Sequence, residues 1–248
     1  MRVNIFIINL FLVLNVISRS GNMMAGIPGD ELNAKENAII SQPFRQYRFK
    51  NITAKDGLSF YRVRVITQDN YGFMWFGADN GLDRFDGKNM TSFKHNASDP
   101  GSIPANEISC LLNNPGEDRI WIGTRGGLCY MDIKTFEITR IDLGPYNNIR
   151  TIAEAHKHGL WICNQNGLLR FDEAKHDYTV YNTTNSNLSH NHVRSIYEDR
   201  SGNLWVGTVD KLNLLKADSG DFKTFDLKGE YEKPIQNNLI LAISPRYK

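Results

Sequence analysis

Only three cysteines occur in the 248 residues, and the charges nearly cancel. Cys110, Cys129 and Cys163 are an odd number without close spacing, so neither a disulfide framework nor a zinc-binding pattern is indicated. Cys110 lies in an alternating apolar run and is expected to be a small core residue. There are 29 basic and 27 acidic residues, with no run of five like charges. Because nucleic-acid binding needs a basic stripe, no nucleic-acid partner is predicted.

Apolar runs are also scarce, and one at residues 3–17 stands out. It follows Arg2, contains three asparagines and is shorter than the roughly 20 residues that span a bilayer. A short apolar run after a positive residue predicts a signal peptide over 1–25 and therefore export to the periplasm; a membrane anchor or a buried strand is the alternative. Residues 26–44 are then a linker.

The four tryptophans are regularly spaced. Trp75, Trp121, Trp161 and Trp205 are separated by 46, 40 and 44 residues. That is the period of a four-stranded propeller blade, and it is longer than most solenoid repeats. An open β-solenoid or several small sheets is the alternative. The predicted fold is therefore all-β, with a partial propeller over 45–248.

Each tryptophan stands in the same local pattern, which predicts four strands per repeat. A β-prone run precedes each tryptophan, the tryptophan marks a second strand, and Gly-Leu-x-x-Phe-Asp or a variant marks a third. The expected first strands are 63–66, 108–112, 149–152 and 193–197, and the expected fourth strands are 90–94, 136–141, 178–181 and 222–225. Trp205 and Gly207 share one strand face, where a glycine allows neighbouring sheets to approach closely. Asp69 and Asp199 each begin an Asp-x-x-Gly turn and are expected to accept hydrogen bonds from turn amides.

These residues resemble the two-component regulator propeller repeat. The matching pattern is D-x-x-G-x-[LI]-W-[IV]-G-T-x-x-G-L, best seen at 199–208 and 69–82, and residues 52–59 also resemble the start of such a sensor. The resemblance implies the periplasmic sensor part of a hybrid two-component histidine kinase of the Bacteroides type. Relatives of that kind are inner-membrane proteins that respond to glycan fragments.

The sequence departs from the full family pattern because it contains no kinase segment, no nucleotide-binding glycine box and no second membrane span. Residues 237–243 look like a fifth first strand, whose tryptophan would fall beyond Lys248. We therefore expect an N-terminal fragment: four blades and part of a fifth, in an incomplete ring. Open blade faces would favour self-association, and membrane contact is expected only through the missing C-terminal part.

Ligand contacts are expected from the loops between the second and third strands and from the loops that enter each blade. These loops vary while the strands repeat, as binding loops on a fixed scaffold do. An arginine can hold a carboxylate or sulfate, and the amides and acids can bond sugar hydroxyls. The predicted ligand-binding residues are Asp79, Asn80, Arg125, Gln165, Asn166, Asp210 and His192, with Asn106 and Asn148 as further entering-loop residues. The alternative interpretation is that each of them is a solvated turn residue.

No metal, cofactor or catalytic residue is predicted. The His156-x-His158 and His190-x-His192 pairs lie at expected turns without a third ligand nearby. The leading hypothesis is a non-catalytic, glycan-responsive sensor portion. A secreted lyase-like propeller enzyme and a protein-interaction scaffold are the alternatives; binding without turnover distinguishes the sensor from the enzyme.

Overall fold

The computed structural model describes residues 51–114, 116–156, 159–217, 219–226 and 243. The chain divides into two units, Met1–Thr53 and Ala54–Lys248, and every described strand lies in the second. The predicted signal peptide and linker, and residues 237–242 of the predicted fifth blade, lie outside the described residues. Among the residues that are described, no helix has the length and hydrophobicity needed to cross a membrane.

The described residues of the second unit form four antiparallel sheets of four strands, each built from consecutive strands, after one short 3-10 helix at Ala54–Asp56. Each sheet is an up-and-down meander, which is the form of a propeller blade. The strands are β1 (Val63–Gln68), β2 (Met74–Ala78), β3 (Gly81–Phe85) and β4 (Met90–Phe93) in blade 1; β5 (Ile108–Asn113), β6 (Arg119–Thr124), β7 (Gly127–Asp132) and β8 (Ile138–Ile141) in blade 2; β9 (Ile149–Glu154), β10 (Leu160–Asn164), β11 (Leu168–Asp172) and β12 (Asp177–Tyr181) in blade 3; and β13 (Val193–Glu198), β14 (Leu204–Thr208), β15 (Leu212–Leu215) and β16 (Phe222–Phe225) in blade 4.

The predicted strands are confirmed, with one main correction; in addition, the strand predicted at 90–94 ends at Phe93 and that predicted at 178–181 begins at Asp177. All four first strands begin at the predicted residue and run one or two residues further. The expected fourth strand at 136–141 is wrong at its start, because β8 begins at Ile138. Phe136 has a φ of 64° and its amide donates to the Asp132 carbonyl at 2.8 Å, so it belongs to the turn before the strand. A positive φ is incompatible with extended strand backbone.

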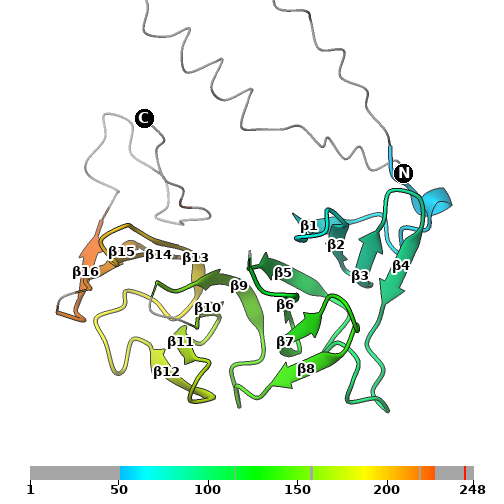
Figure 1. Ribbon diagram of the computed structural model, residues 1–248. Helices are drawn as coiled ribbons and strands as arrows, with labels where there is room; N and C mark the ends of the chain where they lie inside the picture. The colour runs from blue at the N-terminus through cyan, green and yellow to red at the C-terminus, as the bar shows by residue number, and fades with distance from the viewer. Residues whose placement is uncertain (1–50, 115, 157–158, 218, 227–242, 244–248) are drawn as a thin grey trace, which may run out of the picture. The chain divides into compact units, whose positions relative to one another are not determined.

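The blades follow one another around an arc within the second unit. Figure 1 shows the four sheets side by side in chain order, with β1, β5, β9 and β13 along the inside. Adjacent first strands contact each other, β1 with β5, β5 with β9 and β9 with β13. The predicted incomplete propeller ring is confirmed for the described residues.

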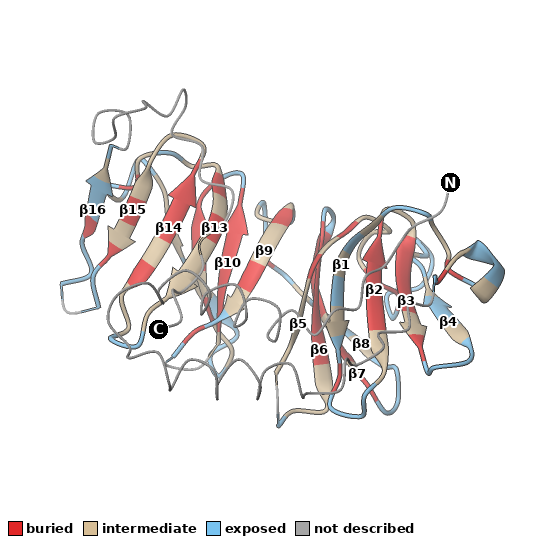
Figure 2. Cartoon of the chain, turned by 90° about the horizontal axis from the view of Figure 1, so that it is seen from above, coloured by how far each residue is buried: buried red, intermediate tan, exposed pale blue. Residues whose placement is uncertain are grey.

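The hydrophobic core lies between the blades, in three clusters, and Figure 2 shows the buried positions concentrated on the inner and middle strands. One cluster joins blades 1 and 2 around Trp75 and Ile120. A second joins blades 2 and 3 around Trp121 and Phe171, and a third joins blades 3 and 4 around Trp161. Each sheet therefore buries its apolar faces against its neighbours, so stability depends on the interfaces between repeats.

The tryptophans of the first three blades pack toward the blade that follows. Trp75, Trp121 and Trp161 are 0%, 2% and 7% exposed. Trp205 has no described blade beyond it, and it is only partly buried, stacked on Phe225 at a ring-centroid separation of 5.8 Å. The tryptophan therefore belongs to the blade interface as much as to its own strand.

The glycine two residues after the tryptophan permits this close packing, as predicted. A Cβ atom on Gly77 would lie 2.6 Å from the Ile108 side chain of the next blade. A Cβ atom on Gly123 would lie 2.7 Å from Ile149 and 2.3 Å from the Cys110 sulfur. In blade 3 this position is Cys163, which is fully buried. Small side chains are required here because the sheets leave no room for larger ones.

Three aspartates at the ends of third strands, Asp86 just after β3, Asp132 at the end of β7 and Asp172 at the end of β11, make the stability sensitive to acid. Asp86, Asp132 and Asp172 accept hydrogen bonds from nearby turn amides, at 2.6 to 3.2 Å. These amides lower the pKa of Asp86 and Asp132, while the Lys175 ammonium, followed by its amide, lowers that of Asp172, all from the ordinary 3.8. A depressed pKa in the folded state stabilises the fold above pH 3.8, and this contribution is lost as the pH falls below that value.

We therefore expect the free energy of unfolding, measured by urea denaturation, to fall between pH 4 and pH 3. A variant with all three aspartates changed to asparagine should lose less stability over the same interval, because the amide does not titrate. An unchanged pH dependence in this triple variant would show that other groups are responsible.

Candidate functional site

The turns between second and third strands and the loops that enter the blades lie together, as the sequence predicted. The Arg125 amide, in the turn after β6, donates to the Glu107 carbonyl just before β5 at 3.2 Å. The Val209 amide, after β14, donates to the His192 carbonyl just before β13, also at 3.2 Å. We call this end of the blades the turn edge.

A β-bulge occurs at the same position of all four first strands, next to the turn edge. In each first strand, the residue after the strand's first residue has no partner in the pairing with the neighbouring strand. The four residues at this bulge position are Arg64, Ser109, Arg150 and Arg194. A bulge twists the strand and re-aims the side chain that it frees, so it is commonly conserved at binding sites.

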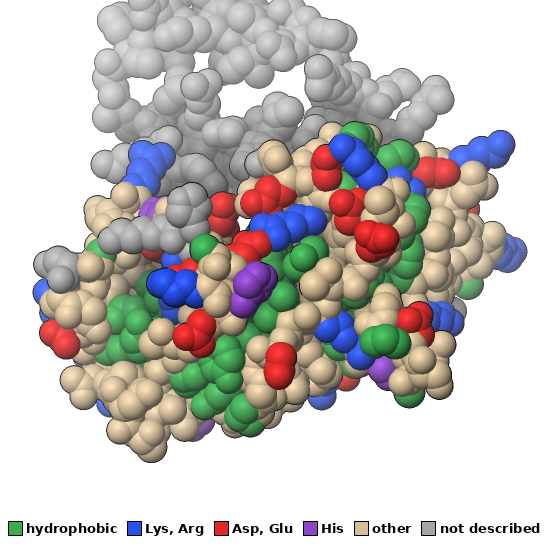
Figure 3. All heavy atoms as spheres, turned by 60° about the horizontal axis from the view of Figure 1, so that its bottom comes forward, with side chains coloured by type: hydrophobic (Ala, Val, Ile, Leu, Met, Phe, Trp, Pro, Cys, Tyr) green, Lys and Arg blue, Asp and Glu red, His purple; other side chains and the backbone are tan. Residues whose placement is uncertain are grey.

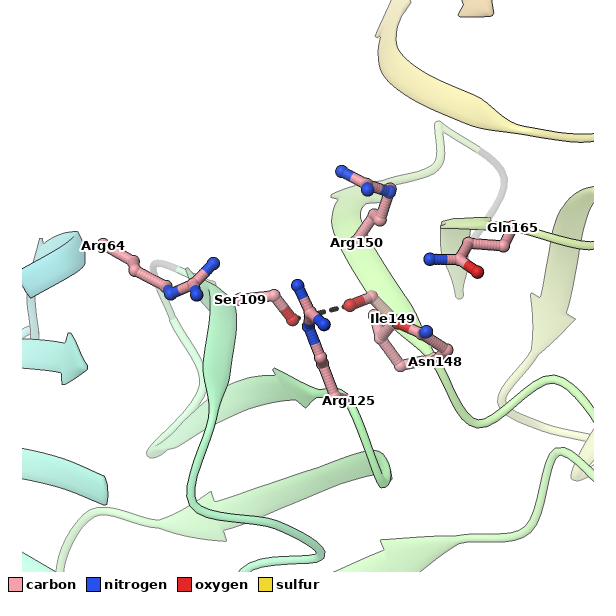
Figure 4. A pocket seen from close by; sticks show the side chains of 7 residues that line it. All are labelled: Arg64, Ser109, Arg125, Asn148, Ile149, Arg150 and Gln165. Atoms are coloured by element: carbon pink, nitrogen blue, oxygen red, sulfur yellow. Dashed lines mark hydrogen bonds between the residues drawn. The ribbon is translucent and has the colours of Figure 1, made fainter. Parts of the chain in front are cut away.

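The bulge residues of the first three blades line one hollow of about 340 Å³, which we call the arginine hollow. Its wall is formed by seven residues: Arg64, Ser109, Arg125, Asn148, Ile149, Arg150 and Gln165. In Figure 4, Arg64 approaches from the β1 side, Arg125 from the turn after β6 and Gln165 from the turn after β10. The Ser109 hydroxyl is 2.6 Å from the Ile149 carbonyl and so ties blade 2 to blade 3.

Acidic partners are concentrated at the blade 1 side of the hollow. Glu107 accepts from the Arg64 guanidinium at 2.5 Å and lies 3.0 Å from Nε of Arg125. Asp79 pairs with Arg64 and with Arg62. Among the described residues, no ion pair includes Arg150 or Arg194.

Arg150 of blade 3 and Arg194 of blade 4 are therefore close together, and no described carboxylate pairs with either of them. Burial lowers the pKa of Arg150, and the neighbouring Arg194, Arg125 and Arg64 lower it further. Burial followed by Arg150, Arg194 and His190 lowers the pKa of His192. In the described part of the chain, Nε of Arg150, Nε of Arg194 and Nε2 of His192 are buried without a hydrogen-bond partner. Buried polar groups normally have partners, so these three donors or acceptors are available to a ligand or to water.

This concentration of positive charge differs from the face of the molecule seen in Figure 3. There, basic and acidic side chains are interspersed. In the arginine hollow and beside it, Arg64, Arg125 and Arg194 lie close enough to Arg150 to lower its pKa, and two carboxylates accompany the four guanidinium groups. The chemistry available is bidentate recognition of an oxyanion, together with amide contacts from Asn148 and Gln165.

Only some of the predicted ligand-binding residues lie at the arginine hollow. Arg125, Gln165 and Asn148 line the arginine hollow, and His192 lies beside Arg150 and Arg194. Asp79 is engaged by Arg64. Asn106 joins blades 1 and 2, because its carbonyl accepts from Gly81 and its side chain accepts from the His95 amide. The remaining three, Asn80, Asn166 and Asp210, lie in the turns after β2, β10 and β14.

Three residues of this site, Arg64, Arg150 and Arg194, were not predicted from the sequence. A signal for them exists: each directly follows the first residue of a first strand, at the same place in the repeat. Aligning the repeats on their tryptophans places the three arginines in one column, each 11 residues before its tryptophan, while Ser109 lies 12 residues before Trp121.

The cysteine and histidine residues of the described chain show no clustering for chemistry. Cys110, Cys129 and Cys163 are buried and free, and burial raises the pKa of Cys110 and Cys129 to about 12. This confirms Cys110 as a core residue. The rings of His190 and His192 are 6.5 Å apart in the loop before β13. Within the described ranges, no group of three or more His, Cys, Asp or Glu side chains could hold a metal.

Comparison with known proteins agrees with the repeat. The family described as two component regulator propeller matches residues 187–210, which include β13 and β14 of blade 4. Histidine kinase P4 of Formosa agariphila is 42% identical over 55 residues, which are 22% of this chain and 4% of that protein. The chain therefore spans a small part of this relative.

Solved structures share the fold. The extracellular domain assigned to the hybrid two component system BT3049 of B. thetaiotaomicron is 28% identical, with a TM-score of 0.67, over 73% of this chain and 26% of that one. Virginiamycin B lyase from Staphylococcus aureus is 16% identical, with a TM-score of 0.57, over 75% of this chain and 62% of that one, and this likeness concerns the fold alone. The chain therefore contains a two component regulator propeller repeat at residues 187–210, within a set of four blades similar to the extracellular domain assigned to BT3049.

Proposed function

We propose that this chain is a periplasmic, ligand-sensing propeller portion of a hybrid two-component sensor, and that its ligand is an oligosaccharide. The observation that carries the proposal is the likeness to an extracellular domain assigned to such a system, at 28% identity over 73% of the chain. The match to a histidine kinase over 55 residues supports the same assignment. In this proposal the propeller binds the ligand, and phosphotransfer belongs to a separate kinase segment.

The turn edge supports a role in binding. Its loops differ among the blades in the residues they present, while the strands beneath them repeat, and the arginine hollow opens there. Its volume of about 340 Å³ falls within the range of small-molecule sites. Polar side chains from three blades converge on it, as saccharide recognition requires.

The test is binding without turnover by the full 248-residue chain. We expect a glycan array to identify a small set of oligosaccharides, and titration calorimetry with each of them to give a saturable heat. Mass spectrometry of the ligand after prolonged incubation should recover it intact. Cleavage of the bound glycan would instead support the lyase-like enzyme, and a chain that binds no glycan would overturn the proposed ligand class.

A further inference from the structure

We infer that the ligand is an acidic saccharide, whose carboxylate or sulfate groups are held by the bulge-position arginines Arg150 and Arg194 together with Arg125. This inference rests on the proposed function and adds the chemical class of the ligand. It follows from the placement of the cations, their lack of partners and the shape of the hollow.

The placement of the arginines is built into the backbone. Four successive blades have a bulge at the same strand position, and three of the four bulge residues are arginine. Arginines spaced along adjacent inner strands repel one another, which costs stability in a partly buried site. Arg64 is compensated by Glu107 and Asp79. For Arg150 and Arg194 the described chain supplies no such compensation.

Two neighbouring arginines of this region have unsatisfied donors. Nε of Arg150 and Nε of Arg194 are both buried without a hydrogen-bond acceptor among the described residues. An oxyanion supplies acceptors to several guanidinium donors at once and neutralises the repulsion. Arg125, whose side chain is 51% exposed, can approach from the turn edge.

The uncharged polar residues that line the arginine hollow are suited to the hydroxyl groups of a sugar. Asn148 and Gln165 line the hollow beside Arg150, and amide groups both donate to and accept from hydroxyls. A small inorganic anion only accepts hydrogen bonds and would leave the amide oxygens without a donor, whereas the hydroxyls of an acidic saccharide can donate to them. The combination of cations and amides favours the saccharide.

The experiment is titration calorimetry of the full chain with four probes: a trigalacturonate, a chondroitin sulfate disaccharide, a neutral galactotriose and sodium sulfate. We expect binding of one or both acidic saccharides, and an affinity at least tenfold weaker for the neutral sugar and for sulfate. The affinity should fall as the salt concentration rises from 50 to 200 mM, because exposed charge interactions are screened.

The variants Arg150→Gln and Arg194→Gln should each weaken acidic-saccharide binding about 10- to 100-fold, because a charge-assisted hydrogen bond is lost. Arg150→Lys, which keeps the charge but not the bidentate geometry, should lie between the wild type and Arg150→Gln. The matched control is Arg200→Gln, which removes the same charge from an exposed turn at the opposite end of β13 and should change affinity less than twofold. Thermal unfolding of each variant confirms folding; if Arg150→Gln does not fold, Arg194→Gln and Arg150→Lys provide the test.

Each result decides between the two proposals. Galactotriose binding as tight as that of the acidic sugars, and insensitive to Arg150→Gln and Arg194→Gln, would overturn the acidic ligand and leave the glycan sensor in place. Sulfate binding as tight as the acidic saccharides would overturn the saccharide as ligand while retaining an anion site. No binding of any probe, with a saturable glycan found on the array, would overturn this inference alone.

Discussion

Trp121→Ala is expected to destabilise the protein by about 3 to 5 kcal/mol, the range for removing a large aromatic side chain from a core. Trp121 is 2% exposed and lies between blades 2 and 3. Its ring is 5.1 Å from that of Tyr130 in its own blade and 6.3 Å from that of Phe171 in the next, both in edge-to-face geometry. The substitution therefore opens a cavity within one blade and across one interface, and urea denaturation of the full chain measures the cost.

The repeat itself supplies the matched control. Trp205 occupies the same position of blade 4, but its ring is only partly buried and the described chain has no fifth sheet against it. Trp205→Ala should therefore cost clearly less than Trp121→Ala. Equal costs for the two substitutions would show that the tryptophan acts mainly within its own sheet, contrary to the interface role assigned here.

The number of blades and the positions of their strands could be predicted because one residue type marks each repeat. A tryptophan every 40 to 46 residues, with a glycine two residues on in three of the four blades, reflects the packing of one sheet on the next. The error at Phe136 has a local cause. Phe136 is apolar and next to a strand, so its side chain fits the strand pattern, while the turn backbone places it at a φ of 64°.

The candidate site was only partly predictable, for a different physical reason. Turn residues such as Arg125 and Gln165 could be identified because loops vary between repeats. Arg150 and Arg194 were missed because the regular alternation of a strand assigns each residue to one face of its sheet and gives these two no special position. A bulge breaks that alternation. The recurrence of arginine at one repeat position hints at a shared role, but the bulge itself is evident only from the register of strand pairing.

Asp69→Ala is expected to cost about 2 to 4 kcal/mol, since it removes three hydrogen bonds around a buried tryptophan. One carboxylate oxygen of Asp69 accepts from the Tyr71 and Phe73 amides, at 2.9 and 3.0 Å. The other accepts from the Trp75 indole at 2.8 Å, and Trp75 is fully buried. With alanine at this position the indole N–H has no partner, and leaving a buried donor unsatisfied costs more than the bond itself contributed.

A double-mutant cycle with Trp75→Phe isolates this interaction. In the Trp75→Phe background no indole N–H remains, so Asp69→Ala should cost about 1 to 2 kcal/mol less than in the wild type. Aspartate is a common calcium ligand, and such a role for Asp69 predicts a different outcome: added Ca²⁺ would raise the melting temperature of the wild type and EDTA would lower it. With the carboxylate fully used by the turn and the indole, we expect neither reagent to change the melting temperature, and additive costs in the cycle would contradict the assigned hydrogen bond.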